Sequence, residues 1–228
     1  MTELSRVRLN PTRRDTHRLL SSPQAMHAAV MGSHPQLADE DSAGRVLWRV
    51  DQAKTHDIQL YVVSPSAPDF TGLIEQAGWP SQPQWDSTAY EPFLDRLDAG
   101  QAWRFRLTAN PVRVLPKQPG GPRRGRVSPH LTADQQREWL VKHARSWGFD
   151  VATDETFGVL SEVSERHTVN FGRREADAGR SRVSLSRASF AGLLTVVDPS
   201  ALRTALVGGM GRAKAYGCGL MTLAPPRS

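Results

Sequence analysis

The chain has 228 residues, of which 39% are hydrophobic and 23% are charged, values typical of a folded protein with a buried core. No apolar run reaches the length of a secretion signal or a membrane span, so we expect a cytoplasmic protein. The single cysteine, Cys218, excludes an internal disulfide and a cysteine-based metal cluster, and we expect it to be a small buried side chain.

The charge is divided unevenly along the chain. Residues 1–100 contain 9 Lys and Arg against 13 Asp and Glu, whereas residues 101–228 contain 20 against 10. Arginine dominates the basic half, and its guanidinium group can bind two phosphate oxygens at once. The basic half is therefore a candidate phosphate-binding region, although a GC-rich genome is an alternative source of arginine.

The first hundred residues show the pattern of one small domain. In chain order they predict a strand, a helix, two strands, a helix and a weak edge strand, at residues 3–10, 24–31, 45–50, 57–63, 69–77 and near Trp85. The helix after Ser22 is clear, because Ser22 is a good N-cap and Pro23 suits the first helical position. This order of elements is that of a ferredoxin-like domain.

The second half repeats this order without repeating the residues. Residues 91–100 form the predicted boundary, and we expect domains at 1–95 and 96–228. The predicted elements are a strand at 101–109, an irregular basic stretch at 110–129, a helix from Thr132 to Gly148, two strands around a basic loop at 172–181, a helix from Asp198 to Val207 and a strand at 220–224.

A glycine-rich run lies just before the last strand. Gly208, Gly209, Gly211, Gly217 and Gly219 surround Arg212 and Lys214, which favours tight turns and a close approach to an anion. The run is not a nucleotide-binding loop, because it lacks both the Lys-Ser/Thr of a P-loop and the third glycine of a dinucleotide fingerprint. A plain turn into the last strand is the alternative interpretation.

The chain contains seven histidines, and His27 is the one on the first predicted helix. Met26, Ala29 and Val30 form the apolar face of this helix, and His27 lies beside that face, three residues after Gln24. The residues alone do not distinguish a catalytic histidine from a structural one.

Four segments together resemble the CasE family, the CRISPR-associated endoribonucleases of type I-E systems. They are residues 4–11, the Met26-His27 pair, residues 103–111 and residues 209–225, which occur in the family's order and spacing. The resemblance implies an α+β protein with two tandem ferredoxin-like (RRM-like) βαββαβ domains. It also implies a subunit that binds the CRISPR repeat hairpin of precursor RNA, cuts at its base and stays in the Cascade complex with the product.

The resemblance implies cleavage without metal or cofactor, by attack of the ribose 2′-hydroxyl on the adjacent phosphate to leave a cyclic phosphate and a 5′-hydroxyl. His27 aligns with the family's catalytic histidine, a group that can transfer protons near neutral pH. Some members have a tyrosine where this chain has Gln24, which can position a phosphate but offers no phenolic proton. Tyr216 in the glycine-rich run is the candidate substitute.

The resemblance also points to RNA-binding residues in the basic half. We expect phosphate contacts from the basic hairpin, the glycine-rich run and the irregular basic stretch, at Arg173, Arg174, Arg180, Arg182, Gly209, Gly211, Arg212, Lys214, Arg123, Arg124 and Arg126. A solvated arginine loop is the alternative for each arginine. For the whole chain the alternatives are a non-catalytic CRISPR-RNA-binding subunit of the same fold and an RNA-binding module of translation or RNA maturation.

Overall fold

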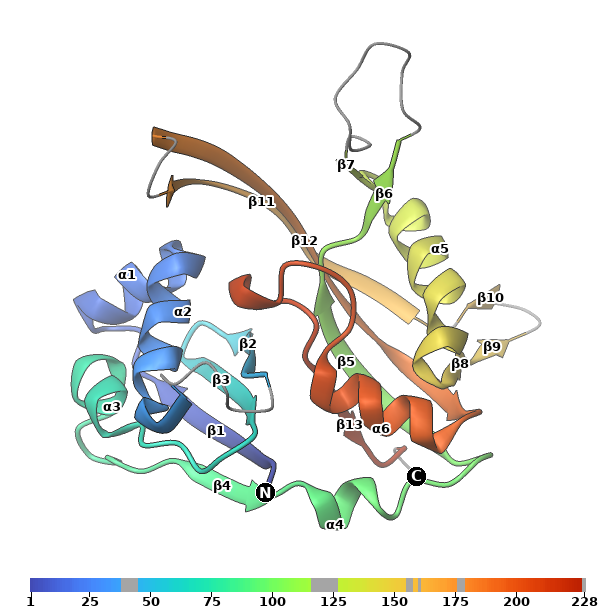
Figure 1. The fold of residues 1–228 in the computed structure, drawn as a ribbon, viewed down its shortest axis with the longest axis horizontal. Coiled ribbons are helices and arrows are strands. Elements are labelled where there is room, and N and C mark those ends of the chain that lie inside the picture. The colour runs from blue at the N-terminus through green and yellow to red at the C-terminus, as the bar shows by residue number, and fades with distance from the viewer. Residues whose placement is uncertain (38–44, 116–126, 155–157, 160, 176–178, 227–228) are drawn as a thin grey trace.

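A computed structural model describes residues 1–37, 45–115, 127–154, 158–159, 161–175 and 179–226. Two large antiparallel sheets lie side by side, each with helices packed against it, and the described residues also form two small two-stranded sheets (Figure 1). None of the described helices combines the length and the apolar character that crossing a bilayer would need. The arrangement places the two predicted repeats next to each other, one in each half of the chain.

The first sheet has the strand order β2-β3-β1-β4, with all neighbours antiparallel. Its strands and the helices of this half are β1 (Glu3–Leu9), α1 (Arg14–Ser21), α2 (Pro23–Gly32), the 3-10 turn η1 (Pro35–Leu37), β2 (Leu47–Lys54), β3 (Asp57–Ser64), α3 (Thr71–Ala77) and β4 (Asp86–Ala89). A short helix, α4 (Glu91–Leu94), follows at the predicted boundary. The proposed division at residues 95 and 96 stays a prediction.

Helix α2 begins at the position that the sequence predicts, directly after Ser22. The Ser22 side chain accepts a hydrogen bond from the backbone N–H of Ala25 at 3.2 Å, and Pro23 occupies the first turn. This cap satisfies one of the free N–H groups at the helix start. The cap therefore fixes the residue at which α2 begins, and His27 lies in the helix after it.

The second sheet has the order β11-β12-β5-β13, and a short strand also pairs with β12. Its main elements are β5 (Ala102–Ala109), α5 (Ala133–Ala144), β11 (Ser161–Glu175), β12 (Gly179–Val196), α6 (Pro199–Gly208) and β13 (Met221–Ala224). The smaller ones are β6 (Val112–Val114), β7 (Val127–Pro129), η2 (Arg145–Trp147), β8 (Phe149–Val151), β9 (Thr153–Asp154), β10 (Gly158–Val159) and η3 (Lys214–Tyr216). Both halves thus have the βαββαβ order and the same sheet order, which confirms the tandem ferredoxin-like fold.

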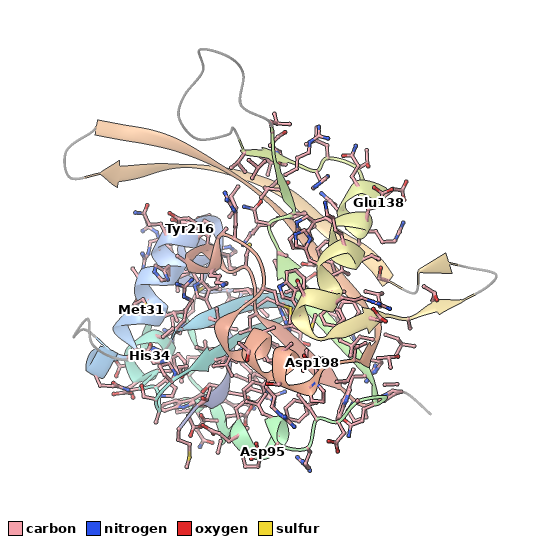
Figure 2. The ribbon with its side chains drawn as sticks, turned by 45° about the vertical axis from the view of Figure 1, so that its right-hand side comes forward. Met31, His34, Asp95, Glu138, Asp198 and Tyr216 are labelled. Atoms are coloured by element: carbon pink, nitrogen blue, oxygen red, sulfur yellow. The ribbon has the colours of Figure 1, made fainter. Side chains whose placement is uncertain are left out.

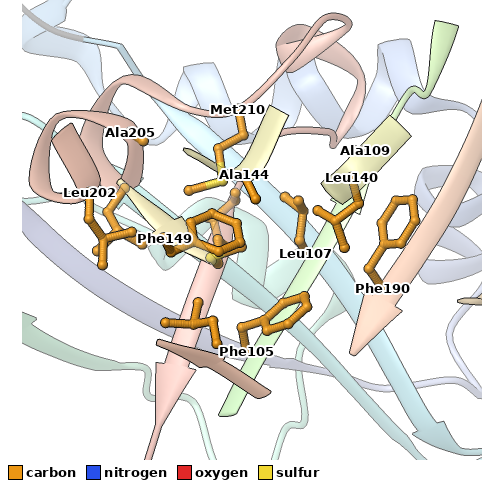
Figure 3. Packing of buried hydrophobic residues seen from close by; sticks show 14 of the residues in the cluster. Phe105, Leu107, Ala109, Leu140, Ala144, Phe149, Phe190, Leu202, Ala205 and Met210 are labelled. Carbon is orange, nitrogen blue, oxygen red and sulfur yellow. The ribbon is translucent and has the colours of Figure 1, made fainter. Parts of the chain in front are cut away.

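Each half has its own hydrophobic core. In the first, α1, α2 and α3 cover one face of the sheet through residues such as Met26, Val30 and Trp48. Figure 3 shows the second core, where Phe105 and Leu107 of β5 pack with residues from α5, β12 and α6. Leu47 and Val63 of the first sheet belong to this second cluster. Apolar burial therefore holds the two halves against each other.

A buried arginine also joins the two halves. Arg49 of β2 is 1% exposed, and its guanidinium group pairs with Asp51 through Nε and Nη2, each at 2.8 Å. It also donates to the carbonyl oxygens of Arg106 at 2.7 Å and Leu220 at 3.1 Å, and to the Thr222 hydroxyl at 2.8 Å. All three acceptors lie in the second half. The contact ties β2 to the end of the glycine-rich run.

The prediction of an irregular stretch at 110–129 is wrong at both of its ends. Strands β6 and β7 pair there, with Val112 opposite Pro129 and Val114 opposite Val127. Pro129 is tolerated in β7 because β6 and β7 form a two-stranded sheet, in which each strand is an edge strand. The predicted arginines 123, 124 and 126 lie outside the described residues.

The predicted loop at 172–181 is also wrong, because β11 and β12 continue through most of it. Pairing extends from Gly172 opposite Arg182 to Glu175 opposite Gly179. Backbone pairing across the ladder holds these residues as strands, so polar and charged side chains do not end them. The hairpin of β11 and β12 projects from the sheet and extends past α1 in Figure 1.

Candidate functional site

The glycine-rich run folds back on itself and onto β5. The Met210 N–H donates to the Gly219 carbonyl at 2.9 Å, and the Gly219 N–H donates to the Thr108 carbonyl at 2.7 Å. The turns require left-handed backbone at four of the glycines and also at Ala213, whose φ is 63°. Between the turns lies the 3-10 segment η3, which carries Lys214 and Tyr216.

The segment η3 packs against α2, the helix that carries Gln24 and His27. Figure 2 shows Tyr216 beside the N-terminal helices, and Figure 1 shows the same neighbourhood from a second direction. Two of the segments predicted from sequence, which lie at opposite ends of the chain, are thus neighbours in space. We take this junction, with the hairpin β11–β12 above it, as the candidate active site.

His27 is half-buried on α2, and burial lowers its pKa below the ordinary value of 6.5. Its Nδ1 is enclosed and has no hydrogen-bond partner among the described residues, whereas Nε2 is not enclosed in this way. The imidazole is therefore mostly neutral at pH 7, and Nε2 is the nitrogen that a substrate can reach. Gln24, one turn earlier on the same helix, is exposed.

The remaining residues of the predicted site differ in exposure. Arg212 is exposed, and Lys214 is partly buried, with a pKa lowered by that burial and by the positive charge of Arg45. Tyr216 is half-buried and already engaged in an interaction with the rest of the protein. Arg212 is thus the cation of the run that is most available to a phosphate.

Two glycines of the predicted RNA contact have visible packing roles. A Cβ added at Gly209 would lie 2.6 Å from Leu47 Cδ2, and one at Gly211 would lie 3.4 Å from the Trp139 ring. These glycines let the run approach β2 and α5. Their backbone contact with RNA stays a prediction.

The four hairpin arginines lie on paired strands and not in a loop. Arg174 is opposite Arg180, Arg173 is opposite Ser181, and Arg182 is opposite Gly172. The ladder brings these arginines into a short, regular stretch of backbone near the end of the hairpin. Their contact with RNA also stays a prediction.

The sequence reasoning did not find Trp48 and Arg49, the residues of β2 that hold the glycine-rich run. A Cβ added at Gly217 would lie 2.5 Å from Trp48 Cζ3, so the run lies directly on the indole ring. The sequence did contain a signal for Arg49. It follows Leu47 and Trp48 in the strand, and Asp51 comes two residues later on the same face of the sheet, which indicates a buried ion pair. No local signal pointed to Trp48.

The chain is similar to a known protein family and to individual members of known function. A model of the family described as CRISPR associated protein matches residues 4–225. The CRISPR-associated endoribonuclease Cse3 of Thermus thermophilus is 27% identical over 97% of this chain and 99% of its own length. The Cascade subunit CasE of Escherichia coli is 29% identical over 57% of this chain and 61% of its own length.

A solved structure of Cse3 bound to a 19-nucleotide RNA is similar to this fold throughout. The TM-score is 0.79, with 27% identity, and the alignment covers 98% of this chain and 100% of that one. The sequence and structural matches therefore agree along nearly the whole chain. They show that the chain belongs to the CasE family of CRISPR-associated proteins.

Proposed function

We propose that the chain is an endoribonuclease that binds the repeat stem-loop of CRISPR precursor RNA, cuts the RNA at the base of the stem and keeps the product. Two facts support this proposal: the relative Cse3 is named an endoribonuclease, and it has been solved with RNA bound. The relative named as a Cascade subunit supports assembly with the other Cascade proteins. The CRISPR repeat hairpin and these subunits are thus the proposed partners.

The packing of α2 on η3 is the observation that carries the proposal. Helix α2 carries the half-buried His27, and it contacts η3, which carries Lys214 and begins two residues after Arg212. Cleavage by a ribose 2′-hydroxyl needs a proton acceptor and positive charge near the same phosphate. The junction offers both, and a basic hairpin extends from the sheet beside it.

In the proposed reaction, His27 Nε2 takes the proton of the 2′-hydroxyl. The O2′ atom attacks the phosphorus, the bond from phosphorus to O5′ breaks, and O5′ leaves with a proton. The products are a 2′,3′-cyclic phosphate and a 5′-hydroxyl, without a metal ion or cofactor. Arg212 and Lys214 offset the charge of the phosphorane, and Gln24 positions the phosphate. Tyr216 is the candidate donor of the proton to O5′.

The alternative is an RNA-binding subunit of the same fold that does not cut. Gln24 favours it, because the amide has no acidic proton to give to the leaving oxygen. Under this alternative the hairpin and the glycine-rich run would still bind the stem. The two functions differ in one measurable property, which is cleavage.

The deciding experiment incubates the protein with its cognate repeat RNA in excess EDTA. We expect cleavage to a cyclic phosphate by the wild type, and loss of cleavage with retained binding in His27→Ala. The matched control is His56→Ala, since His56 is exposed in the turn between β2 and β3. RNA that stays intact with the wild type, although bound, supports the alternative.

A further inference from the structure

A shallow groove lies along helix α6, beside the turn that follows α5. Its volume is about 590 Å³, within the range of pockets that hold small ligands, and its lining includes Trp147, Ser200, Thr204, Gly208, Gly209 and Lys214. Figure 1 shows both the glycine-rich run and the end of α5 next to α6. The lining residues span α6 from its first turn to its last, so the groove leads from η3, the segment that contacts α2, along the length of the helix.

Lys214 lies at the end of the groove that is nearest the candidate active site. Its side chain follows the glycine-rich run, because a Cβ added at Gly209 would lie 3.0 Å from Lys214 Cε and one at Gly219 would lie 3.3 Å from Lys214 Cγ. The ammonium group is partly buried, Arg45 adds positive charge to its surroundings, and it makes no ion pair within the described part of the chain. A partly desolvated cation of this kind is stabilised by an anion bound in the groove.

Trp147 gives the groove a rigid aromatic wall. Its ring stacks with those of His143 and Phe149, at centroid distances of 5.6 Å and 6.3 Å, and meets the Trp139 ring edge to face at 5.6 Å. Trp147 nevertheless stays partly exposed, and its indole N–H makes no hydrogen bond to the residues that the structure describes. The neighbouring rings thus fix the indole in place and leave part of it, with one donor, available to a ligand.

The other lining side chains are small and polar. The Thr204 hydroxyl donates to the Ser200 carbonyl at 3.0 Å, so its oxygen can still accept a hydrogen bond. Among the described lining residues the acidic one is Asp198, and its carboxylate already accepts from the Ala201 N–H at 3.0 Å. A cation, an exposed aromatic surface and hydroxyl acceptors suit the phosphate, base and ribose hydroxyl of single-stranded RNA.

We propose that this groove binds the unpaired RNA segment that leads into the stem from its 5′ side, with a phosphate at Lys214 and a base against Trp147. The inference rests on the proposed function. Bases paired in the stem are stacked and cannot pack against the groove, whereas unpaired bases can. At the base of the stem the 5′ strand lies directly opposite the strand that is cut, so it enters beside the junction of α2 and η3. The groove begins at that junction.

Retention of the product favours the 5′ segment over the 3′ segment as the occupant. After the cut, the stem and the RNA on its 5′ side remain one molecule, while the RNA on the 3′ side becomes a separate fragment. Contacts with the 5′ segment therefore add to the affinity for the product that is kept, whereas contacts with the 3′ fragment would slow its release. The groove thus helps the protein to hold the product after cleavage.

The test measures equilibrium binding of two RNAs, the stem-loop alone and the stem-loop with an unpaired 5′ extension, both with a 2′-deoxyribose at the attacking nucleotide so that neither is cut. The extension should tighten binding to the wild type by about five-fold or more, the contribution of one base packed on an aromatic ring. Trp147→Leu removes the aromatic wall, and Thr204→Trp fills the groove from an exposed position. Both variants should lose this gain and bind the stem-loop alone as the wild type does. The control is Trp103→Leu, a partly buried tryptophan outside the groove, which should keep the gain.

A second measurement reports on the base itself. With 2-aminopurine at the unpaired nucleotide next to the stem on its 5′ side, binding to the wild type should quench the fluorescence, and Trp147→Leu should lose this quenching. Equal affinity of the wild type for the two RNAs, or equal weakening of both RNAs by Trp147→Leu, overturns the inference and leaves the proposed function in place. So does an extension without effect combined with variants that no longer assemble with the other Cascade proteins, which would make the groove a protein-docking site. Unmodified RNA that the wild type binds but never cuts overturns the proposed function instead.

Discussion

Gly217 lies face to face with the indole of Trp48, and a Cβ at Gly217 would come within 2.5 to 3.0 Å of three atoms of that ring. The φ of Gly217 is 77°, so the backbone also requires a residue that tolerates the left-handed region. This contact places the end of η3 on β2 and thereby next to α2. The position of Tyr216 thus depends on one glycine.

We expect Gly217→Ala to destabilise the protein by about 2–4 kcal/mol, because it adds backbone strain and a clash with a buried ring. Urea unfolding measures the change. Gly208→Ala is the matched control, since nothing lies within 4 Å of a Cβ there and Gly208 ends helix α6. The control should change stability by less than about 1 kcal/mol. Equal stability of the two variants would contradict the packing described for Gly217.

Arg49→Met should lower the free energy of unfolding by about 2–4 kcal/mol, because it leaves three acceptors without their donor and removes the buried partner of Asp51, which among the described residues keeps only its ion pair with Arg106 at 3.1 Å. The exposed pair of Arg145 and Asp150 provides the comparison, because the Arg145 side chain is 78% exposed. Arg145→Met should cost less than about 1 kcal/mol. A cost for Arg49→Met as small as that for Arg145→Met would show that Arg49 does not hold the halves together.

Signals that act within a few residues were sufficient to predict helices α2, α3, α5 and α6. The Ser22 cap forms as expected, and the structure also shows a capping box of Thr132 with Gln135 and a cap at Asp198, each a hydrogen bond between near neighbours in the chain. The α+β class and the tandem fold followed from the order of these elements. Cys218 is buried as expected, and burial raises its thiol pKa to about 12.

Features that depend on distant partners were not predictable in this way. Residues 172–175 and 179–181 look like part of a loop by composition and are held as strands by pairing across the hairpin. The approach of η3 to α2 depends on Trp48, whose role becomes visible only when Gly217 is seen against it. His27 itself was selected among seven histidines by family resemblance and not by its own chemistry.

The pH dependence of cleavage reports the role of His27. Burial lowers its pKa, and a base must be neutral to accept a proton, so kcat/KM should fall as the pH is lowered through a value below 6.5. A histidine acting as the acid would give the opposite sign, with kcat/KM falling as the pH rises through its pKa. Measurement between pH 4.5 and 8 distinguishes the two, and the residual activity of His27→Ala should lack this acid limb.

The hairpin arginines should govern the electrostatic part of RNA binding. Each Arg that neutralises a phosphate releases counterions, so replacing Arg173 and Arg174 with Gln should flatten the slope of log K against log salt by roughly one to two. The control replaces Lys142 and Arg145 with Gln. These are two exposed cations near the end of α5, so the control removes as much positive charge as the hairpin variant. It should leave the slope nearly unchanged, because the hairpin and α5 project in different directions from the second sheet (Figure 1). If both double variants flatten the slope equally, net charge alone drives binding and the hairpin has no special contact with the stem.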